Sequence, residues 1–309
     1  MAYVDPLEWL ASEDFPNFTA PARHAWHYTN AAGLMGIVTS QTLFASATEV
    51  VNDSSEVNYG IDLVRQVWKD VAARSDFPPA NVTYISEALS DDWPNYIANS
   101  IFIVSASEDS DLLGQWRGYA GGDGFAIGFD LESTGWRCPG PARVSTVFPL
   151  GWRKVTYDTV EQRALAEAHL RAYAAGPAAA PADWASRSDA RSQFMPITRA
   201  KLSSLVSLLK HPAFADEREV RHVEGTIGGE VRFRATGRGI VPYVEMRAVE
   251  LIRWNGVSLA GDEITRLPIH EVAVGPGAGP SACASLQRYL ASHGYGDVNV
   301  RMSSIPLRP

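Results

Sequence analysis

Apolar side chains recur in several parts of the chain with the spacing of amphipathic helices. After Thr29 or Asn30, either of which could serve as an N-cap, apolar residues follow at Leu34, Ile37 and Val38. A second helix is predicted to begin near Ser54, because the apolar positions after it share one face: Val57, Ile61, Val64, Trp68 and Val71. Further helices are predicted over 162–174, 191–209 and 281–292.

Short apolar runs bounded by polar turns predict strands. Residues 26–29 (WHYT) and 101–104 are the first of these, with an extended piece at Leu43 and Phe44 between them. The turn Gly121-Gly-Asp-Gly124 leads into a strand over 125–129. Residues 144–157 predict one or two strands, and the chain changes to short strands after His211-Pro212. These later strands are predicted at 219–224, 231–235, 240–246, 249–253, 270–274 and 298–302.

The order of these elements indicates the fold class. Helices predominate early, strands predominate late, and the two rarely alternate one for one, which favours α+β over a doubly wound α/β fold. We predict one α+β domain over residues 1–309. A helical insertion is expected at 159–210, with a Pro/Ala-rich loop at 174–185 (AAGPAAAPADWA).

Composition changes this picture in three ways. The 309 residues are 46% apolar and 20% charged, enough for a substantial core without disulfides or metals. The two cysteines, Cys138 and Cys283, lie far apart and are expected to be inert thiols in a reducing compartment. No secretory signal and no membrane-spanning stretch are evident, so we expect a cytoplasmic protein without membrane contact.

The net charge of −8 argues against broad nucleic-acid binding, because such proteins usually carry a basic surface. The net charge does not exclude a local basic groove, since arginines cluster over 218–238. No carboxylate cluster or His pair predicts a metal site, and residues 52–56 (NDSSE) are interpreted as helix capping. The motifs GxSxG, HExxH and CxxC are absent.

His27 is the first candidate site residue. It lies at the end of a predicted strand and just before a helix N-terminus, where it could bond a ligand hydroxyl beside a bound anion. The alternative is a half-buried histidine with a purely structural role.

The segment from Ser105 to Tyr119 is the second candidate. Ser105 and Ser107 follow an apolar strand, and Asp109 or Ser110 would cap a helix over 111–119. On that helix, Leu112, Leu113 and Trp116 are expected to face the core, and Gln115, Arg117 and Tyr119 to be more exposed. Hydroxyl groups beside an aromatic-bearing helix could form a stacking platform for a flat heterocycle.

Glu217, Glu219 and Arg221 form the third candidate. On a strand these alternate residues share one face, which gives a pair of carboxylates beside an arginine. Such a pair could hold a ribose hydroxyl or stabilise an oxocarbenium ion. The alternative is a charge ladder that protects an edge strand from aggregation.

Several of these motifs together resemble a widespread bacterial family, domain-of-unknown-function family 2971. The resemblance runs from about Trp26 to Pro309 in preserved order and brings no agreed activity. The motifs are HYT, ND..E, SxSE, LLxQWRxYA with GFAIGFD after it, KHPxFxxEREVR, RxxxRGIVPY and a C-terminal VGP…GY.

A second resemblance, to the ADP-ribosyltransferase superfamily, implies a fold and an activity. It implies a central split sheet of antiparallel or mixed strands with flanking helices. His27 would hold the NAD ribose, Ser105, Ser107 and Tyr119 would face nicotinamide, and Glu217 or Glu219 would be the catalytic carboxylate. The remaining cofactor contacts would come from Tyr28, Thr29, Gln115, Trp116, Arg117 and Arg221.

The implied activity is an NAD-dependent ADP-ribosyltransferase that modifies a protein or nucleic acid. Many bacterial members of that superfamily are toxins or phage-defence effectors, so an antitoxin or partner protein is a possible companion. Three alternatives stay open. They are a non-catalytic module that binds a nucleotide or a partner, a nucleic-acid-processing effector that uses the arginines of 218–238, and a protein whose motifs are only capping and core packing.

Overall fold

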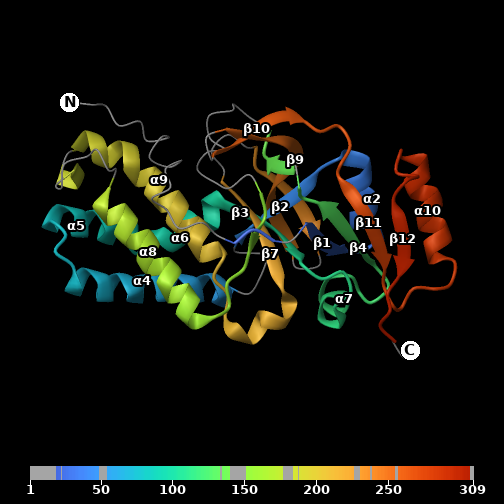
Figure 1. The fold of residues 1–309 in the computed structure, drawn as a ribbon, viewed down its shortest axis with the longest axis horizontal. Coiled ribbons are helices and arrows are strands. Elements are labelled where there is room, and N and C mark those ends of the chain that lie inside the picture. The colour runs from blue at the N-terminus through green and yellow to red at the C-terminus, as the bar shows by residue number, and fades with distance from the viewer. Residues whose placement is uncertain are drawn as a thin grey trace.

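The computed structural model describes residues 19–21, 23–48, 54–132, 134–139, 151–176, 184–186, 188–225, 230–236, 239–254 and 257–306. Within this part of the chain, a group of helices lies on one side of a large twisted sheet, and smaller helices lie around the rest of it (Figure 1). The class is α+β, as predicted.

The helical layer combines two separate segments of the chain. The first contributes α4 (Ser54–Arg74), α5 (Pro79–Ala88) and α6 (Trp93–Ser100). The second contributes α8 (Thr159–Ala175), the 3-10 turn η1 (Trp184–Ser186) and α9 (Ser188–Ser207). The remaining helices are α2 (Ala31–Ser40), α7 (Leu113–Tyr119), α10 (Ala282–Ser292) and the 3-10 helix η2 (Pro212–Glu217). The predicted 159–210 helices therefore pack against helices from 54–100.

The strands of the described chain join into one mixed sheet. Its central path follows the order β10-β9-β2-β3-β1-β4-β11-β12, and β5, β6, β7 and β8 attach to it at the sides. The strands are β1 (His24–Thr29), β2 (Leu43–Ala47), β3 (Ile101–Ser107), β4 (Phe125–Asp130), β5 (Thr134–Arg137), β6 (Arg153–Lys154), β7 (Glu219–Gly225), β8 (Arg232–Thr236), β9 (Gly239–Trp254), β10 (Val257–Glu263), β11 (Ile269–Val274) and β12 (Asn299–Met302). All pairings are antiparallel except β11 with β12.

The two faces of β3 and β7 bury different cores. Ile101, Ile103 and Val223 point into the helical layer, where they meet apolar residues of α4, α5, α6, α8 and α9. Phe102, Val104, Ala106 and Val220 point into a second core shared with β2, β4, β9, β11 and α10. This alternation follows from the two-residue period of a strand and explains the near-continuous apolar run at 101–104.

Several predicted boundaries differ from the structure. Residues 240–246 and 249–253 form one strand, β9, and α7 begins at Leu113 without a side-chain cap from Asp109 or Ser110. The sequence did not predict α5, α6, β5 or β10. The Asn30 cap is confirmed, because its side chain accepts a bond from Gly33 N at 2.9 Å. Residues 140–150, with the first half of the predicted 144–157 strands, and residues 177–183 of the Pro/Ala-rich loop lie outside the described residues, as do Asn52 and Asp53. The described half of 144–157 contains the short strand β6.

Trp93 offers a test of the helical layer. Its side chain is 0% exposed, and its indole N–H donates to Ser203 Oγ at 2.9 Å. We expect Trp93→Ala to lower the free energy of unfolding by about 3–5 kcal/mol, because it opens a cavity between α6 and α9. Urea denaturation would measure this loss. Val160→Ala, at a side chain that is 75% exposed, is the control and should change stability little; equal losses in both variants would contradict this account of the core.

Candidate functional site

A split in the sheet beside β3 creates the space for a site. One edge of β3 pairs with β7 over its whole length, from Ile101 to Ser107. The other edge is shared: β2 pairs with it at Phe102 and Ile103, and β1 pairs with it at Ser107 alone. Between these two contacts the neighbouring strands diverge from β3. The backbone of β3 around Ser105 is therefore left without a strand partner on that edge.

His27 bridges this split. Its Nδ1 lies 2.9 Å from the carbonyl oxygen of Ser105. A carbonyl oxygen can only accept, so Nδ1 carries the proton, and in the neutral ring Nε2 is the acceptor. Burial lowers the pKa of His27, and Arg234 lowers it further, while the bond to Ser105 acts in the opposite direction. The ring is thus neutral near pH 7, with one acceptor nitrogen for a ligand hydroxyl.

A pocket of about 480 Å³ occupies the split. Its volume falls in the range of small-molecule and cofactor sites. The residues that line it are His27, Tyr28, Phe44, Ser46, Ile103, Val104, Ser105, Ala106, Gln115, Gly118, Tyr119, Glu217, Glu219, Arg234, Thr236 and Val241. They come from β1, β2, β3, α7, η2, β7, β8 and β9, so the pocket depends on segments that lie far apart in the sequence.

Tyr28 attaches α7 to the sheet. Its hydroxyl donates to the carbonyl of Asp109 and accepts from the backbone N–H of Leu112, each at 3.0 Å. Its ring meets that of Trp116 edge to face, at 4.8 Å between centroids. Trp116 is fully buried and donates to Asp111 from its indole. These contacts hold α7 so that Gln115 and Tyr119 reach the pocket.

A tight reversal of the chain brings Glu217 to the same place. Glu217 ends η2, and Arg218 after it has a left-handed backbone with φ of 46°. Ser107 Oγ donates to the carbonyl of Glu217 at 2.9 Å, and the Arg218 carbonyl accepts from Glu108 N. The chain then enters β7 at Glu219. The sequence suggested that Glu217 lies on the strand with Glu219, but Glu217 precedes the strand. The two side chains nevertheless bind the same partner.

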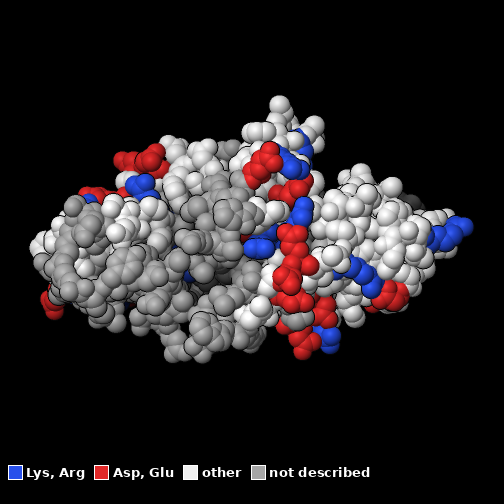
Figure 2. Space-filling view, turned by 90° about the horizontal axis from the view of Figure 1, so that it is seen from above, with Lys and Arg blue, Asp and Glu red and all other residues white. Residues whose placement is uncertain are grey.

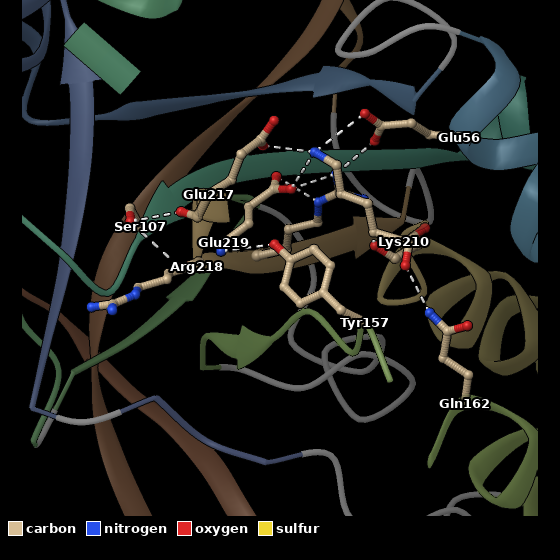
Figure 3. Close-up of polar contacts among 10 residues, drawn as sticks. Glu56, Ser107, Tyr157, Gln162, Lys210, Glu217, Arg218 and Glu219 are labelled. Atoms are coloured by element: carbon tan, nitrogen blue, oxygen red, sulfur yellow. Dashed lines mark hydrogen bonds and ion pairs between the residues drawn. The ribbon is translucent and has the colours of Figure 1, made fainter. Parts of the chain in front are cut away.

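That partner is Lys210, whose side chain is completely buried. Its ammonium lies 2.8 Å from Glu217, 3.0 Å from Glu219 and 3.2 Å from Glu56 (Figure 3). Arg221 completes the cluster: its guanidinium binds both oxygens of Glu219, at 2.7 and 2.8 Å, and Glu56 at 3.1 Å.

We call these five residues the buried ion network: Glu56, Lys210, Glu217, Glu219 and Arg221. Three carboxylates face two cations, so the network carries one excess negative charge when all groups are ionised. Figure 3 shows Glu56 reaching it from α4. Lys210 follows α9, Glu217 ends η2, and Glu219 and Arg221 lie on β7. The network therefore ties the helical layer to the sheet at the pocket wall.

The cations keep Glu219 ionised. Burial alone would raise its pKa, but the charges of Arg221 and Lys210 outweigh burial and hold the pKa at about 2. Burial also opposes the charge on Lys210, yet Glu219, Glu217 and Glu56 raise the pKa of the ammonium above its ordinary value. Tyr119 has a raised pKa from burial and from the two nearby glutamates, so its hydroxyl keeps its proton at neutral pH.

The two glutamates differ in access. The side chain of Glu219 is 4% exposed, and both its oxygens already bind cations. The side chain of Glu217 is 26% exposed and binds Lys210 through one oxygen, Oε2. Among the described residues, Glu217 is thus the carboxylate with an oxygen left for a ligand in the pocket.

The structure brings together one group of the predicted site residues and leaves a second group outside the pocket. The first group is His27, Tyr28, Ser105, Gln115, Tyr119, Glu217 and Glu219. The second is Thr29, Ser107, Trp116, Arg117 and Arg221. Of these, Ser107 donates to the backbone carbonyl of Glu217, and Arg221 binds the carboxylate of Glu219. Both residues therefore position pocket residues without lining the pocket themselves.

Two expectations about exposure were wrong. Gln115 was expected to be exposed, but it is buried because α7 turns it toward the sheet split. The edge-strand charge ladder is also wrong for Glu219 and Arg221, because β7 lies between β3 and β6 and buries both side chains. Their charge serves the buried ion network.

Sequence reasoning missed Lys210 and Arg234. Lys210 stands at the end of the apolar run LVSLLK, a position typical of a helix C-terminus with the ammonium in water. Its proximity in sequence to Glu217 and Glu219 was the available signal. Arg234 was noted only as one of a cluster of arginines, and its place in the pocket depends on the β8–β9 hairpin.

The arginines of 218–238 do not form one basic groove within the described residues. Arg218 pairs with Asp109, Arg221 is buried, and Arg232 pairs with Glu230 and Glu245. Arg238 lies outside the described residues. The face in Figure 2 carries a band of acidic side chains with basic ones interspersed near the middle of the molecule.

Three further observations concern the described part of the chain. No group of three or more histidine, cysteine or acidic side chains there could hold a metal ion. None of its helices combines the length and hydropathy that crossing a membrane would need. Both cysteines, Cys138 and Cys283, are unpaired and partly buried.

A comparison with family models identifies one similarity. Residues 115–222 match the family described as Protein of unknown function (DUF2971), in agreement with the resemblance seen in the motifs. The matched segment contains Gln115, Tyr119, Lys210, Glu217 and Glu219, whereas His27 and Arg234 lie outside it. No curated protein and no solved structure matches the chain. The likeness to ADP-ribosyltransferases therefore stays a prediction.

Glu219 gives a pH-dependent test of the buried ion network. Its pKa is lowered in the folded state, so its contribution to stability is complete above about pH 4.5 and is lost as the pH falls toward 2. We expect Glu219→Gln to lower the free energy of unfolding by about 3–5 kcal/mol at pH 7, because buried Arg221 loses the carboxylate that binds it through both oxygens and buried Lys210 loses one of its partners. Urea denaturation between pH 3 and pH 7 should show this difference shrinking as the solution becomes more acidic. Glu132→Gln, at an exposed side chain, is the control; a pH-independent difference for Glu219→Gln would contradict the assignment.

Proposed function

We propose that this protein is an NAD-consuming ADP-ribosyltransferase that transfers ADP-ribose to a macromolecular acceptor. One observation carries the proposal: His27, Tyr119 and Glu217 come from three distant segments and line one pocket of cofactor size. A protein whose motifs served only capping and packing would not need these three polar groups around a common cavity.

The chemistry needs a negative charge beside the ribose. When the bond between ribose C1′ and the nicotinamide nitrogen breaks, the electron pair leaves with nicotinamide and positive charge develops on the sugar. An ionised carboxylate that accepts a bond from a ribose hydroxyl stabilises that charge. The acceptor group then bonds to C1′ and gives up its proton.

Glu217 is the carboxylate that we assign to the ribose. It is more exposed than Glu219, and only one of its oxygens is bound by Lys210. Lys210 fixes the carboxylate in position, and Glu219 with Arg221 fixes Lys210. Glu219 is accordingly a positioning residue in this proposal.

The other groups of the pocket have roles that suit the same substrate. His27 offers Nε2 as an acceptor for a ribose hydroxyl. Tyr119 is 47% exposed and lines the pocket, where its ring could stack on the nicotinamide ring. Gln115 is buried in the same wall and can both donate and accept, as a carboxamide partner requires.

The second candidate is a non-catalytic module that binds a nucleotide in the same pocket. Both oxygens of Glu219 are already occupied by cations, which favours a structural carboxylate at that position. Tight NAD binding without release of nicotinamide would support this candidate.

The test is release of free nicotinamide from NAD by the purified chain. We expect turnover by the unmodified protein and a loss of about 100-fold or more in Glu217→Gln, because transition-state charge loses its partner. Asp216→Asn is the matched control: it is the same chemical change one residue away, at an exposed side chain outside the pocket.

Two results would count against the proposal. No nicotinamide release by the unmodified protein, together with no thermal stabilisation by NAD, would exclude NAD as substrate. Equal release by the unmodified protein, Glu217→Gln and His27→Ala would show that the chemistry takes place elsewhere. Circular dichroism of each variant would establish that the fold is retained.

A further inference from the structure

Arg234 stands in the pocket wall on the β8–β9 hairpin. In the register of the hairpin, Arg234 lies opposite Val241 and Thr236 lies opposite Gly239. Arg234, Thr236 and Val241 all line the pocket. This face of the hairpin therefore forms a wall distinct from the one built by Glu217 and Glu219.

The guanidinium of Arg234 is held in place by neutral groups. It donates to Ser46 Oγ at 2.8 Å. Its central carbon lies 5.6 Å from the centroid of the Phe44 ring and 5.8 Å from that of Tyr243. The two aromatic rings are themselves packed together, at 4.3 Å between centroids. Cation–π contacts of this kind orient an arginine without neutralising its charge.

No carboxylate among the described residues forms an ion pair with Arg234. Arg232, two residues earlier on the same face of β8, pairs with both Glu230 and Glu245. Burial lowers the pKa of Arg234, yet a guanidinium stays charged at neutral pH. Within the described part of the chain, the pocket thus contains a positive charge without a carboxylate partner.

The charges of the pocket are therefore separated. The carboxylates of Glu217 and Glu219 lie on one wall, and the guanidinium of Arg234 lies on another. A ligand that matches this arrangement has a cationic part and an anionic part. NAD has both, because its nicotinamide ring is positively charged and its diphosphate is negatively charged.

We infer that Arg234 forms an anion subsite of the pocket that binds the diphosphate of a dinucleotide. The planar guanidinium presents paired N–H donors that suit phosphate oxygens, and Ser46, Phe44 and Tyr243 hold it before the ligand arrives. The identity of the dinucleotide as NAD rests on the proposed function. The anion subsite itself rests on the charge of Arg234, which lacks a carboxylate partner within the described part of the chain.

The test measures binding of ADP-ribose to the purified full chain by isothermal titration calorimetry. ADP-ribose contains the diphosphate but not the bond to nicotinamide, so it cannot be consumed. We expect Arg234→Gln to weaken ADP-ribose binding about 10- to 100-fold, as expected for the loss of a charged hydrogen-bonding partner. Arg232→Gln, which removes an already paired arginine from the same strand, should change the affinity by less than about twofold.

Two further ligands test whether the loss of affinity in Arg234→Gln comes from the phosphate groups. Adenosine lacks phosphate, so its affinity should be the same for the unmodified protein and Arg234→Gln. Inorganic pyrophosphate should compete with ADP-ribose on the unmodified protein and lose this ability on Arg234→Gln. Equal ADP-ribose affinities for Arg234→Gln and Arg232→Gln would overturn the inference, as would an unmodified protein that binds neither ADP-ribose nor pyrophosphate.

The outcomes separate this inference from the proposed function. Arg234-dependent binding of ADP-ribose by a protein that releases no nicotinamide from NAD would retain the anion subsite and reject the transferase. Release of nicotinamide with unchanged ADP-ribose affinity in Arg234→Gln would retain the transferase and reject the subsite.

Discussion

The pocket depends on how the backbone of β3 satisfies its hydrogen bonds. One edge of the strand is fully paired with β7, but the other is divided between β2 and β1, which diverge from it around Ser105. A buried carbonyl without a partner is costly, and the imidazole of His27 supplies the partner for Ser105. The hydrogen bond that satisfies the Ser105 carbonyl also sets the tautomer of His27. A continuous sheet at this point would leave no space for a ligand.

The second constraint is electrostatic. Lys210 and Arg221 are buried beside three carboxylates. Burial removes the hydration of these charges, and the cost is offset only because each cation has several partners at short distance. The network fixes Glu217 at the pocket edge. On another wall, Arg234 is oriented by aromatic rings and a hydroxyl instead of carboxylates. One wall thus carries an excess negative charge and leaves a carboxylate oxygen of Glu217 accessible, whereas the other leaves the guanidinium of Arg234 accessible.

The local sequence pattern was sufficient to predict much of the fold and part of the candidate site. The α+β class, the cap at Asn30 and the segments that became β1, β3 and β7 followed from periodicity and capping chemistry. Lys210 could not be predicted in the same way, because its burial depends on Glu56 from a distant helix. The start of α7 was missed for a similar reason: the Tyr28 hydroxyl binds Leu112 N across the fold, where a local cap at Asp109 or Ser110 had been expected. Helix α6, with Pro94 in its first turn, is too short to show a clear period.

The dispersed origin of the pocket walls affects when the site can exist during synthesis. β1 and β3 are made early, the carboxylates follow much later, and Arg234 emerges after them. A nascent chain that has exposed β3 but not yet η2, β7 and β8 outside the ribosome has an imidazole and a strand edge but neither charged wall. All the residues that line the pocket are therefore present only once the chain has been made through Val241 in β9, and a proteolytic fragment that lacks either β1 or β8 lacks part of that lining.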